Sequence, residues 1–257
     1  MRIAIIGCGN IGGEIVRAVC EGRLRSAVVA LMDRYPEKCL HLASTLEKST
    51  GVRPVVAEGI EDLLEVEPDL VVEAASQEAV RQYAKQILRR GVDLVVMSVG
   101  ALLDEGFLQE ISSLDGRIHV PSGAIAGLDA VMAMRHSGIT KVVLRTRKNP
   151  KSLGVGLEEE KVLFEGPASR AVKEFPVNVN VAAALSLAAG REAWVQVIAD
   201  PNVETNIHEL EVVSDASTLR VVVENRPSPS NPRTSYLACL SVVELLRSLE
   251  DKIRIGT

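Results

Sequence analysis

The chain has 257 residues, a net charge of −5 and 25% charged residues. A mildly acidic chain without basic clusters argues against nucleic acid as the main partner, and no apolar stretch approaches the roughly 20 residues that span a bilayer. Aromatic residues make up only 3%, so the core must consist mainly of Val, Leu, Ile and Ala side chains.

Short apolar runs alternate with helical patterns in the first half of the chain. Residues 2–7, 27–33, 69–75 and 93–99 are predicted to form buried strands. The helical stripe between the last two ends at Arg89, Arg90 and Gly91, and basic residues followed by glycine are a typical helix end. The alternation predicts a parallel sheet with right-handed crossovers, which is the Rossmann arrangement.

The first strand ends in GCGNIG, which fits the dinucleotide-binding pattern G-x-G-x-x-G. Gly7 allows a tight turn, Gly9 lets the backbone approach a pyrophosphate, and Gly12 lets the helix pack close to the strand. Asn10 and Ile11 open the helix, whose N-terminal N–H groups would face the phosphates. All five residues are therefore expected to bind a cofactor.

Asp33 ends the second predicted strand, at the distance where an acidic residue accepts hydrogen bonds from the adenine ribose. Its charge would repel a 2′-phosphate, whereas the adjacent Arg34 would partly offset that repulsion. The sequence predicts that NAD is preferred and that NADP can also be used. The alternative is that the glycines only form a turn and that Asp33 is a solvated strand end.

The pattern changes after residue 120. A strand with alternating faces is predicted at 139–148, an Ala-rich helix ending at Gly190, and strands at 193–200, 206–215 and 218–225, the last two forming a hairpin. Residues 226–235 are predicted to be a Pro/Ser linker before a final helix. This is an α+β pattern in which one face of the sheet is covered.

The predicted architecture is therefore an α/β Rossmann domain at residues 1–120 and an α+β domain with a mixed or antiparallel sheet at 121–232. A C-terminal helix within 233–257 is expected to pack back on the first domain. The exposed face of the second sheet is expected to form a homodimer. The substrate of such proteins usually lies at the carboxyl ends of the parallel strands.

The four cysteines, Cys8, Cys20, Cys39 and Cys239, lack the spacing of a zinc knuckle or a redox pair. They are predicted to be reduced thiols of a cytoplasmic protein, and no metal site is predicted. The N-terminus is apolar but lacks the pattern of a signal peptide.

His208 is the one histidine of four that is placed for chemistry. On a strand it would share a face with Leu210 and Val212. An imidazole on an apolar face is costly to bury unless it has a partner or a function. It is either a core histidine bonded to backbone or a catalytic group, and a zinc site is disfavoured because no second histidine or nearby cysteine completes one.

Five motifs appear in the order GCGNIG, PSGAIAGLDA, FPVNVNVAAALSLA, DPNVETNIHEL and NPRTSYLACLSV. As a set they resemble the L-aspartate dehydrogenase family almost from end to end. The resemblance implies NAD(P)-dependent oxidation of L-aspartate through iminoaspartate to oxaloacetate and ammonia, in a route that feeds NAD biosynthesis.

The resemblance also assigns roles to individual residues. His208 corresponds to the catalytic histidine, and Ala124, Asn178 and Asn180 to cofactor contacts. Asparagine is also a good helix N-cap, so a structural role for one of the two asparagines stays open. The sequence does not choose among the cationic candidates for the substrate carboxylates, which are Lys173, Arg191 and Arg233.

Two other functions remain open. One is another two-domain amino-acid dehydrogenase or reductase, such as a homoserine dehydrogenase relative. A dihydrodipicolinate reductase is less well supported because the chain has no adjacent histidines. The other is a non-catalytic NAD(H)-sensing regulator, although no basic recognition helix is present.

Overall fold

The computed structural model describes residues 1–175, 180–253 and 255–256. Two compact units divide the chain: unit 1 is Met1–Pro121 with Cys239–Arg254, and unit 2 is Ser122–Ala238 with Ile255–Thr257. The predicted domain limits at residues 120 and 232 stay a prediction, because compactness does not test whether a segment folds independently.

Unit 1 is built on a six-stranded parallel sheet with the strand order β3-β2-β1-β4-β5-β6. This is the strand order of a Rossmann fold, so the predicted fold class is confirmed. Two very short strands, β3 and β6, escaped prediction because two residues carry no periodic pattern. The strands are β1 Arg2–Ile6, β2 Ala27–Met32, β3 Val55–Val56, β4 Leu70–Glu73, β5 Asp93–Val96 and β6 Ile118–His119.

The helices of unit 1 begin where the local sequence favours a start. Pro36 opens α2, and the side chains of Ser76 and Asp104 cap α4 and α5 by accepting backbone N–H groups. The helices connecting the strands are α1 Asn10–Cys20, α2 Pro36–Thr50, α3 Ile60–Glu65, α4 Gln77–Arg89 and α5 Glu105–Ser112, with the 3₁₀ turn η1 Val99–Leu103.

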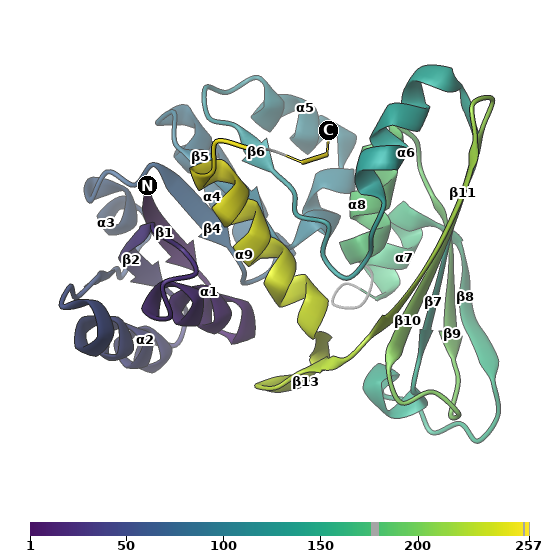
Figure 1. The fold of residues 1–257 in the computed structure, drawn as a ribbon, viewed down its shortest axis with the longest axis horizontal. Coiled ribbons are helices and arrows are strands. Elements are labelled where there is room, and N and C mark those ends of the chain that lie inside the picture. The colour runs from purple at the N-terminus through teal and green to yellow at the C-terminus, as the bar shows by residue number, and fades with distance from the viewer. Residues whose placement is uncertain (176–179, 254, 257) are drawn as a thin grey trace. The chain divides into compact units, whose positions relative to one another are not determined.

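The C-terminal helix α9 (Tyr236–Glu250), drawn in yellow in Figure 1, contributes to the core of unit 1. Its Val242, Val243 and Leu246 are buried in one cluster with side chains of β1, α1 and β2. The Asn10 side-chain amide also donates to Cys239 Sγ at 3.2 Å. The predicted return of this helix to the Rossmann fold is therefore confirmed.

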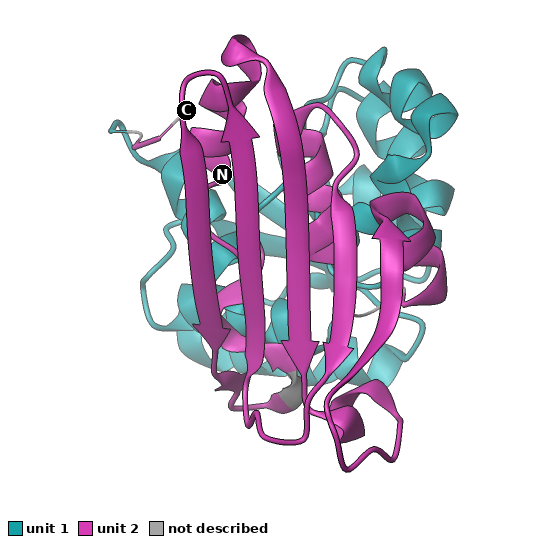
Figure 2. Ribbon diagram, turned by 90° about the vertical axis from the view of Figure 1, so that its right-hand side faces the viewer, with its two compact units in different colours: residues 1–121, 239–254 teal, residues 122–238, 255–257 magenta. Residues whose placement is uncertain are grey.

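Unit 2 contains a five-stranded mixed sheet with the order β11-β10-β7-β9-β8, seen face-on in Figure 2. β7 and β9 are parallel, and the other neighbouring pairs are antiparallel. The edge strand β8 comes from a segment to which the sequence assigned no role. The strands are β7 Ile139–Lys148, β8 Lys161–Pro167, β9 Trp194–Ala199, β10 Asn206–Ser214 and β11 Thr218–Asn225.

Three helices, α6 (Leu128–Met134), α7 (Ala168–Glu174) and α8 (Asn180–Ala189), lie behind the sheet of unit 2 in Figure 2. We call the strand face that carries the buried residues the inner face and the opposite face the outer face. Short 3₁₀ turns, η2 at Arg135–Ser137 and η3 at Pro150–Leu153, lie in the connections.

The predicted Pro/Ser linker at 226–235 is instead a small antiparallel ribbon of β12 (Pro227–Ser228) and β13 (Asn231–Ser235). A two-stranded ribbon consists only of edges. Proline has no backbone N–H to donate to a neighbouring strand. An edge strand has one side without a neighbour, so it can accommodate proline there. The prediction of a linker, which rested on composition alone, was therefore wrong.

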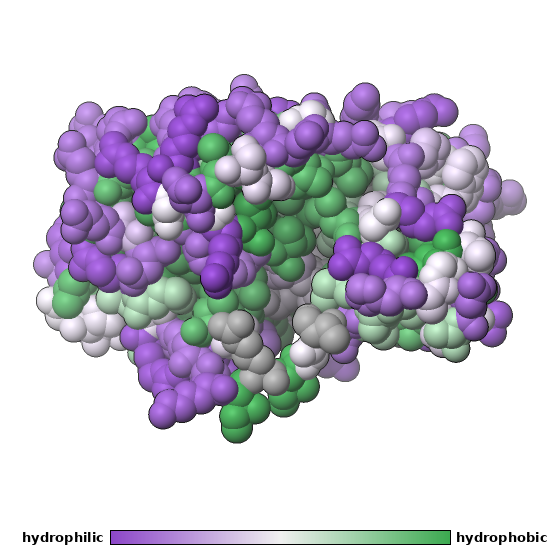
Figure 3. Space-filling model, turned by 90° about the horizontal axis from the view of Figure 1, so that it is seen from above, coloured by the Kyte–Doolittle hydropathy of each residue, from purple (hydrophilic) through white to green (hydrophobic). Residues whose placement is uncertain are grey.

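Hydrophilic residues, in purple, form much of the surface in the view of Figure 3. Over the described residues, no helix is both long and apolar enough to cross a bilayer.

Candidate functional site

The glycine-rich turn between β1 and α1 has the geometry that a dinucleotide site requires. A Cβ on Gly7, where φ is +101°, would lie 2.5 Å from the carbonyl oxygen of Ala74, and a Cβ on Gly12 would lie 2.3 Å from that of Gly7. A Cβ on Gly9 would meet nothing within 4 Å. Contacts within the protein therefore exclude a side chain at Gly7 and at Gly12, whereas Gly9 leaves room for a pyrophosphate.

The N-terminus of α1 suits an anion. Gly9 occupies the N-cap position without a side-chain hydrogen bond, and the first turn contains no acidic residue. Buried Glu14, one turn further on, is paired with Arg17 and Arg23. A phosphate at this end would meet backbone N–H groups and the positive end of the helix dipole.

Asp33 is fixed directly beside the turn. Its Oδ2 accepts the N–H of Cys8 at 2.8 Å, and its Oδ1 accepts the N–H of Tyr35 at 2.9 Å. A carboxylate oxygen can accept a second hydrogen bond, so both remain able to bind ribose hydroxyls. The cations of Arg34 and Lys38 lie 4.9 Å and 4.5 Å from the centre of the Tyr35 ring. The residues that directly follow β2 thus supply a carboxylate held by two backbone N–H groups and two cations on the Tyr35 ring.

Glu73, at the carboxyl end of β4, ties together two loops at the same edge of the sheet. Its Oε1 accepts the N–H groups of Ala75 and Ser76, both at 2.8 Å, and the Ser98 hydroxyl at 2.9 Å, while its Oε2 accepts the Ser98 N–H at 3.0 Å. Burial raises the pKa of this carboxyl, and the four hydrogen bonds oppose that shift. Nothing in the sequence distinguished this residue from an ordinary strand end.

Cys8 and Cys39 are close in space although they are distant in sequence. Their Sγ atoms are 3.2 Å apart, and none of the four cysteines, all of which are described, forms a disulfide. Burial raises the pKa of both thiols and keeps them protonated. The contact joins the glycine-rich turn to α2, which the sequence spacing could not show.

His208 lies on the inner face of β10 and is only 2% exposed. Its Nδ1 is 3.1 Å from the hydroxyl of Thr146 on β7. Burial, together with the nearby charge of Lys148, lowers the pKa of His208 to about 3. The imidazole is therefore neutral at neutral pH. Within the described residues, its Nε2 makes no protein hydrogen bond.

The sequence did not single out Lys148, which ends β7 and is 5% exposed. Burial lowers the pKa of this lysine to about 8. The alternation of β7 could have revealed it, because Val142, Leu144 and Thr146 occupy the inner face and Lys148 continues that series. A buried lysine that is mostly protonated at neutral pH thus lies on the same face as His208.

The cationic residues suggested from sequence for the substrate carboxylates lie in different surroundings. Lys173 is exposed near the end of α7. Arg191 donates to the carbonyl oxygen of Ile139, at the opposite end of β7 from Lys148. The side chain of Arg233 lies outside what the structure describes. Of the two lysines, only Lys148 is buried, and it lies on the same face as His208.

The remaining predicted cofactor contacts belong to unit 2. Ala124 is buried, and its carbonyl oxygen accepts the Asn225 side-chain amide at 3.0 Å. Asn180 is the first residue of α8, and Asn178 lies outside the described residues. The glycine-rich turn and Asp33 belong to unit 1, so the structure groups the predicted residues into two sets, each within its own unit.

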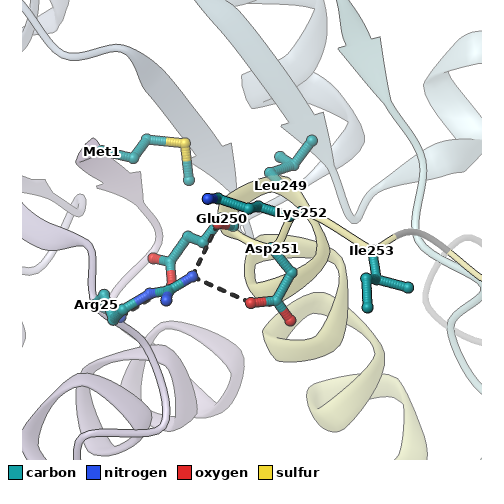
Figure 4. A pocket seen from close by; sticks show the side chains of 7 residues that line it. All are labelled: Met1, Arg25, Leu249, Glu250, Asp251, Lys252 and Ile253. Atoms are coloured by element: carbon teal, nitrogen blue, oxygen red, sulfur yellow. Dashed lines mark hydrogen bonds and ion pairs between the residues drawn. The ribbon is translucent and has the colours of Figure 1, made fainter.

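A pocket of about 690 Å³ lies elsewhere in unit 1, where the end of α9 meets the start of the sheet (Figure 4). The Arg25 guanidinium donates to the carbonyl oxygen of Glu250 at 2.8 Å and to Oδ1 of Asp251 at 3.1 Å. Because Met1 lines it, this pocket lies at the amino end of β1, opposite the carboxyl edge that binds nucleotides in such sheets. Its lining is Met1, Arg25, Leu249, Glu250, Asp251, Lys252 and Ile253.

Comparisons with known proteins agree along the whole chain. Residues 7–119 match the model described as homoserine dehydrogenase, NAD binding domain, and residues 129–249 match that of aspartate dehydrogenase, C-terminal. The L-aspartate dehydrogenase of Methanothermobacter thermautotrophicus is 47% identical, covering 100% of this chain and 99% of that protein. That of Methanocaldococcus jannaschii is 43% identical, covering 100% of both.

A solved structure gives the same result. The crystal structure of aspartate dehydrogenase from Thermotoga maritima is 32% identical to this chain, with a TM-score of 0.81, covering 100% of this chain and 99% of that one.

The burial of His208 predicts a pH-dependent stability. The unfolded chain takes up a proton near pH 6.5, whereas the folded chain does so only near pH 3. The stabilisation is therefore complete above pH 6.5 and is lost as the pH falls toward 3. Between pH 7 and pH 5 this one group should cost the wild type about 2 kcal/mol of unfolding free energy. Because asparagine cannot titrate, the unfolding free energy of His208→Asn should fall by about 2 kcal/mol less than that of the wild type between these two pH values.

Guanidinium chloride unfolding of both proteins at the two pH values measures the difference. Equal losses of unfolding free energy in wild type and variant would show that the imidazole is not buried and neutral.

Proposed function

Because this chain belongs to the L-aspartate dehydrogenase family, we propose that it oxidises L-aspartate with NAD(P) and releases oxaloacetate and ammonia by way of iminoaspartate. The observation that carries the proposal is the neutral imidazole of His208 on the inner face of β10, beside a buried lysine. A protein that only sensed the nucleotide would not need a desolvated base and cation together.

The chemistry divides between cofactor and protein. When bound, the cofactor accepts the hydride that leaves Cα of aspartate. His208 takes a proton from the substrate amino group through Nε2, while Nδ1 stays on the hydroxyl of Thr146. The two carboxylates of the substrate bring negative charge, which raises the proton affinity of the imidazole when it is needed.

Water then adds to the imine carbon, and ammonia leaves to give oxaloacetate. The proton that His208 received returns to solvent or to the leaving nitrogen. The net reaction consumes one water and one oxidised cofactor for each aspartate. Iminoaspartate released before hydrolysis could serve quinolinate formation, which is the place in NAD biosynthesis that we propose for this enzyme.

The residues around the adenosine position support NAD as the preferred cofactor. Asp33 lies beside the glycine-rich turn with its carboxylate held by two backbone N–H groups. A negative charge fixed in this way favours ribose hydroxyls over a 2′-phosphate. Arg34 and Lys38, which lie against the Tyr35 ring, supply positive charge after β2 that could permit NADP as a second cofactor.

The outer face of the unit 2 sheet supports a homodimer. It exposes apolar side chains on three strands, with Trp194 at 47%, Val162 at 47% and Val222 at 63%. Polar groups between them are largely paired within the face, as Arg145 is with Gln196. Such a mixture of apolar and satisfied polar groups suits a protein interface.

Light scattering during size-exclusion chromatography tests this oligomeric state. The wild type should have twice the mass of one chain. Val222→Asp should give single chains, because it places a charge in the interface at a position that tolerates any side chain in the monomer. A wild type that elutes as a single chain would contradict the dimer.

The proposed reaction predicts which substrate is turned over. A panel of L-amino acids is mixed with NAD or NADP, and the absorbance of the reduced cofactor is followed. L-aspartate should be oxidised fastest, and His208→Asn should lower kcat/KM by about 10²- to 10⁴-fold. His41→Asn, at an exposed histidine of α2, should behave as wild type. Turnover of another amino acid in preference to aspartate, or full activity of His208→Asn, would contradict the proposal.

The assignment of Asp33 predicts the cofactor ratio. Asp33→Ala should lower the NAD to NADP ratio of kcat/KM by about tenfold or more, because two hydrogen bonds to the ribose are lost and the repulsion of a 2′-phosphate disappears. Glu37→Ala removes an equal charge from the exposed first turn of α2 and serves as the control. An unchanged ratio in Asp33→Ala would refute the role of this carboxylate.

A further inference from the structure

The inner face of the unit 2 sheet changes from apolar to polar along its strands. Leu210 lies beside Leu144, and Val212 beside Val142. Two residues further, His208 lies beside Thr146, and continuing this register brings Asn206 beside Lys148. The third strand, β11, ends with Asn225 beside Asn206. This polar end of the inner face consists of Thr146, Lys148, Asn206, His208 and Asn225.

Lys148 is costly where it lies. A desolvated ammonium loses several kcal/mol of hydration, and a lysine that is 5% exposed is rare among folded proteins. Alternating residues on one strand are about 7 Å apart, so Lys148 follows Thr146 at that spacing on the same face. The charge of Lys148 is also the second cause, after burial, of the lowered pKa of His208.

Asn225 supplies a second and independent observation. It is 2% exposed, and its Nδ2 donates to the carbonyl oxygens of Ala124 at 3.0 Å and Val223 at 3.4 Å. Its Oδ1 is buried and accepts no hydrogen bond from the described part of the chain. Because an unsatisfied buried acceptor costs roughly 1–3 kcal/mol, this atom indicates a donor that belongs to a ligand.

We propose that the polar end of the inner face recognises the substrate, with Lys148 binding a carboxylate and Asn225 Oδ1 accepting a hydrogen bond from the α-amino group. A cation, a neutral base and an unsatisfied acceptor on one face are complementary to an amino acid that carries an additional carboxylate. The identification of that amino acid as L-aspartate rests on the proposed function, whereas the chemical class follows from these residues.

The charge state of Lys148 suits the binding of a carboxylate. Its pKa of about 8 leaves the ammonium mostly protonated at neutral pH, and an anion nearby would raise its pKa further. A substrate carboxylate would therefore stabilise the charged form of Lys148.

Lys148→Met tests the carboxylate contact, with succinate as a competitive inhibitor of aspartate at saturating NAD. The variant should raise both the KM for aspartate and the Ki for succinate by about 10- to 100-fold, the worth of one charge-assisted hydrogen bond. Its melting temperature, measured beside these constants, distinguishes loss of the carboxylate contact from loss of the fold. Lys148→Arg should recover part of the affinity.

Lys141→Met is the matched control, since Lys141 is an exposed lysine of the same strand that pairs with Glu211. It should leave both constants unchanged. Asn225→Ala should raise the KM for aspartate but not the Ki for succinate, because succinate has no amino group. The affinity of Asn225→Ala for succinate also reports whether this variant is folded.

A lower melting temperature in Lys148→Met with unchanged KM and Ki would reduce Lys148 to a structural residue and overturn the inference. If the wild type does not oxidise aspartate, the proposed function fails on its own. Calorimetry of succinate binding to the wild type and to Lys148→Met in the presence of NAD then still tests the inference, since equal affinities would refute it.

Discussion

The burial of one neutral imidazole is the constraint on which the proposed site depends. His208 is 2% exposed on the inner face of β10, and the only protein hydrogen bond of its imidazole among the described residues joins Nδ1 to Thr146. Desolvation makes the charged form costly, so the ring stays a proton acceptor until an anion arrives. The neighbouring strands fix both partners, because their register sets Thr146 directly beside His208. A strand pair holds such a contact more rigidly than a loop would.

In unit 1, contacts of the backbone hold the candidate cofactor site in place. Gly7 and Gly12 are required because any side chain would collide with a carbonyl oxygen, and Gly9 remains open. Glu73 and Asp33 fix the flanking loops by accepting backbone N–H groups. The carboxyl edge of the sheet is therefore preorganised, so that little ordering would accompany cofactor binding. In both units, the groups assigned to function are held by hydrogen bonds that the function leaves in place.

Much of this architecture could be predicted because it follows from periodicity. The alternation of apolar runs and helical stripes indicated the parallel sheet, the spacing of three glycines indicated the turn, and the two-residue period placed His208 on the apolar face. Asn178, which the family resemblance singled out, lies outside the described residues and stays a prediction. The roles of Ala124 and Asn180 as cofactor contacts also stay predictions.

What the sequence could not show depends on tertiary contacts. β3 and β6 exist only through pairing with a neighbour, and Cys8 meets Cys39 across 31 positions of sequence. The alternation of β7 places Lys148 on the inner face, but it does not reveal how far the buried part of that face extends. Asn225 is distinguished only by its side-chain oxygen, which accepts no hydrogen bond from the described part of the chain. Such an atom can be recognised only when the hydrogen bonds of the surrounding residues are known.

A crystal structure of the dead-end complex with NADH and L-aspartate, in which neither molecule can react, tests the central claim most directly. The account predicts the substrate amino nitrogen at roughly 3 Å from Nε2 of His208, with Nδ1 still bonded to Thr146. A substrate bound elsewhere, with the imidazole enclosed only by protein side chains, would make His208 a core residue and contradict the account.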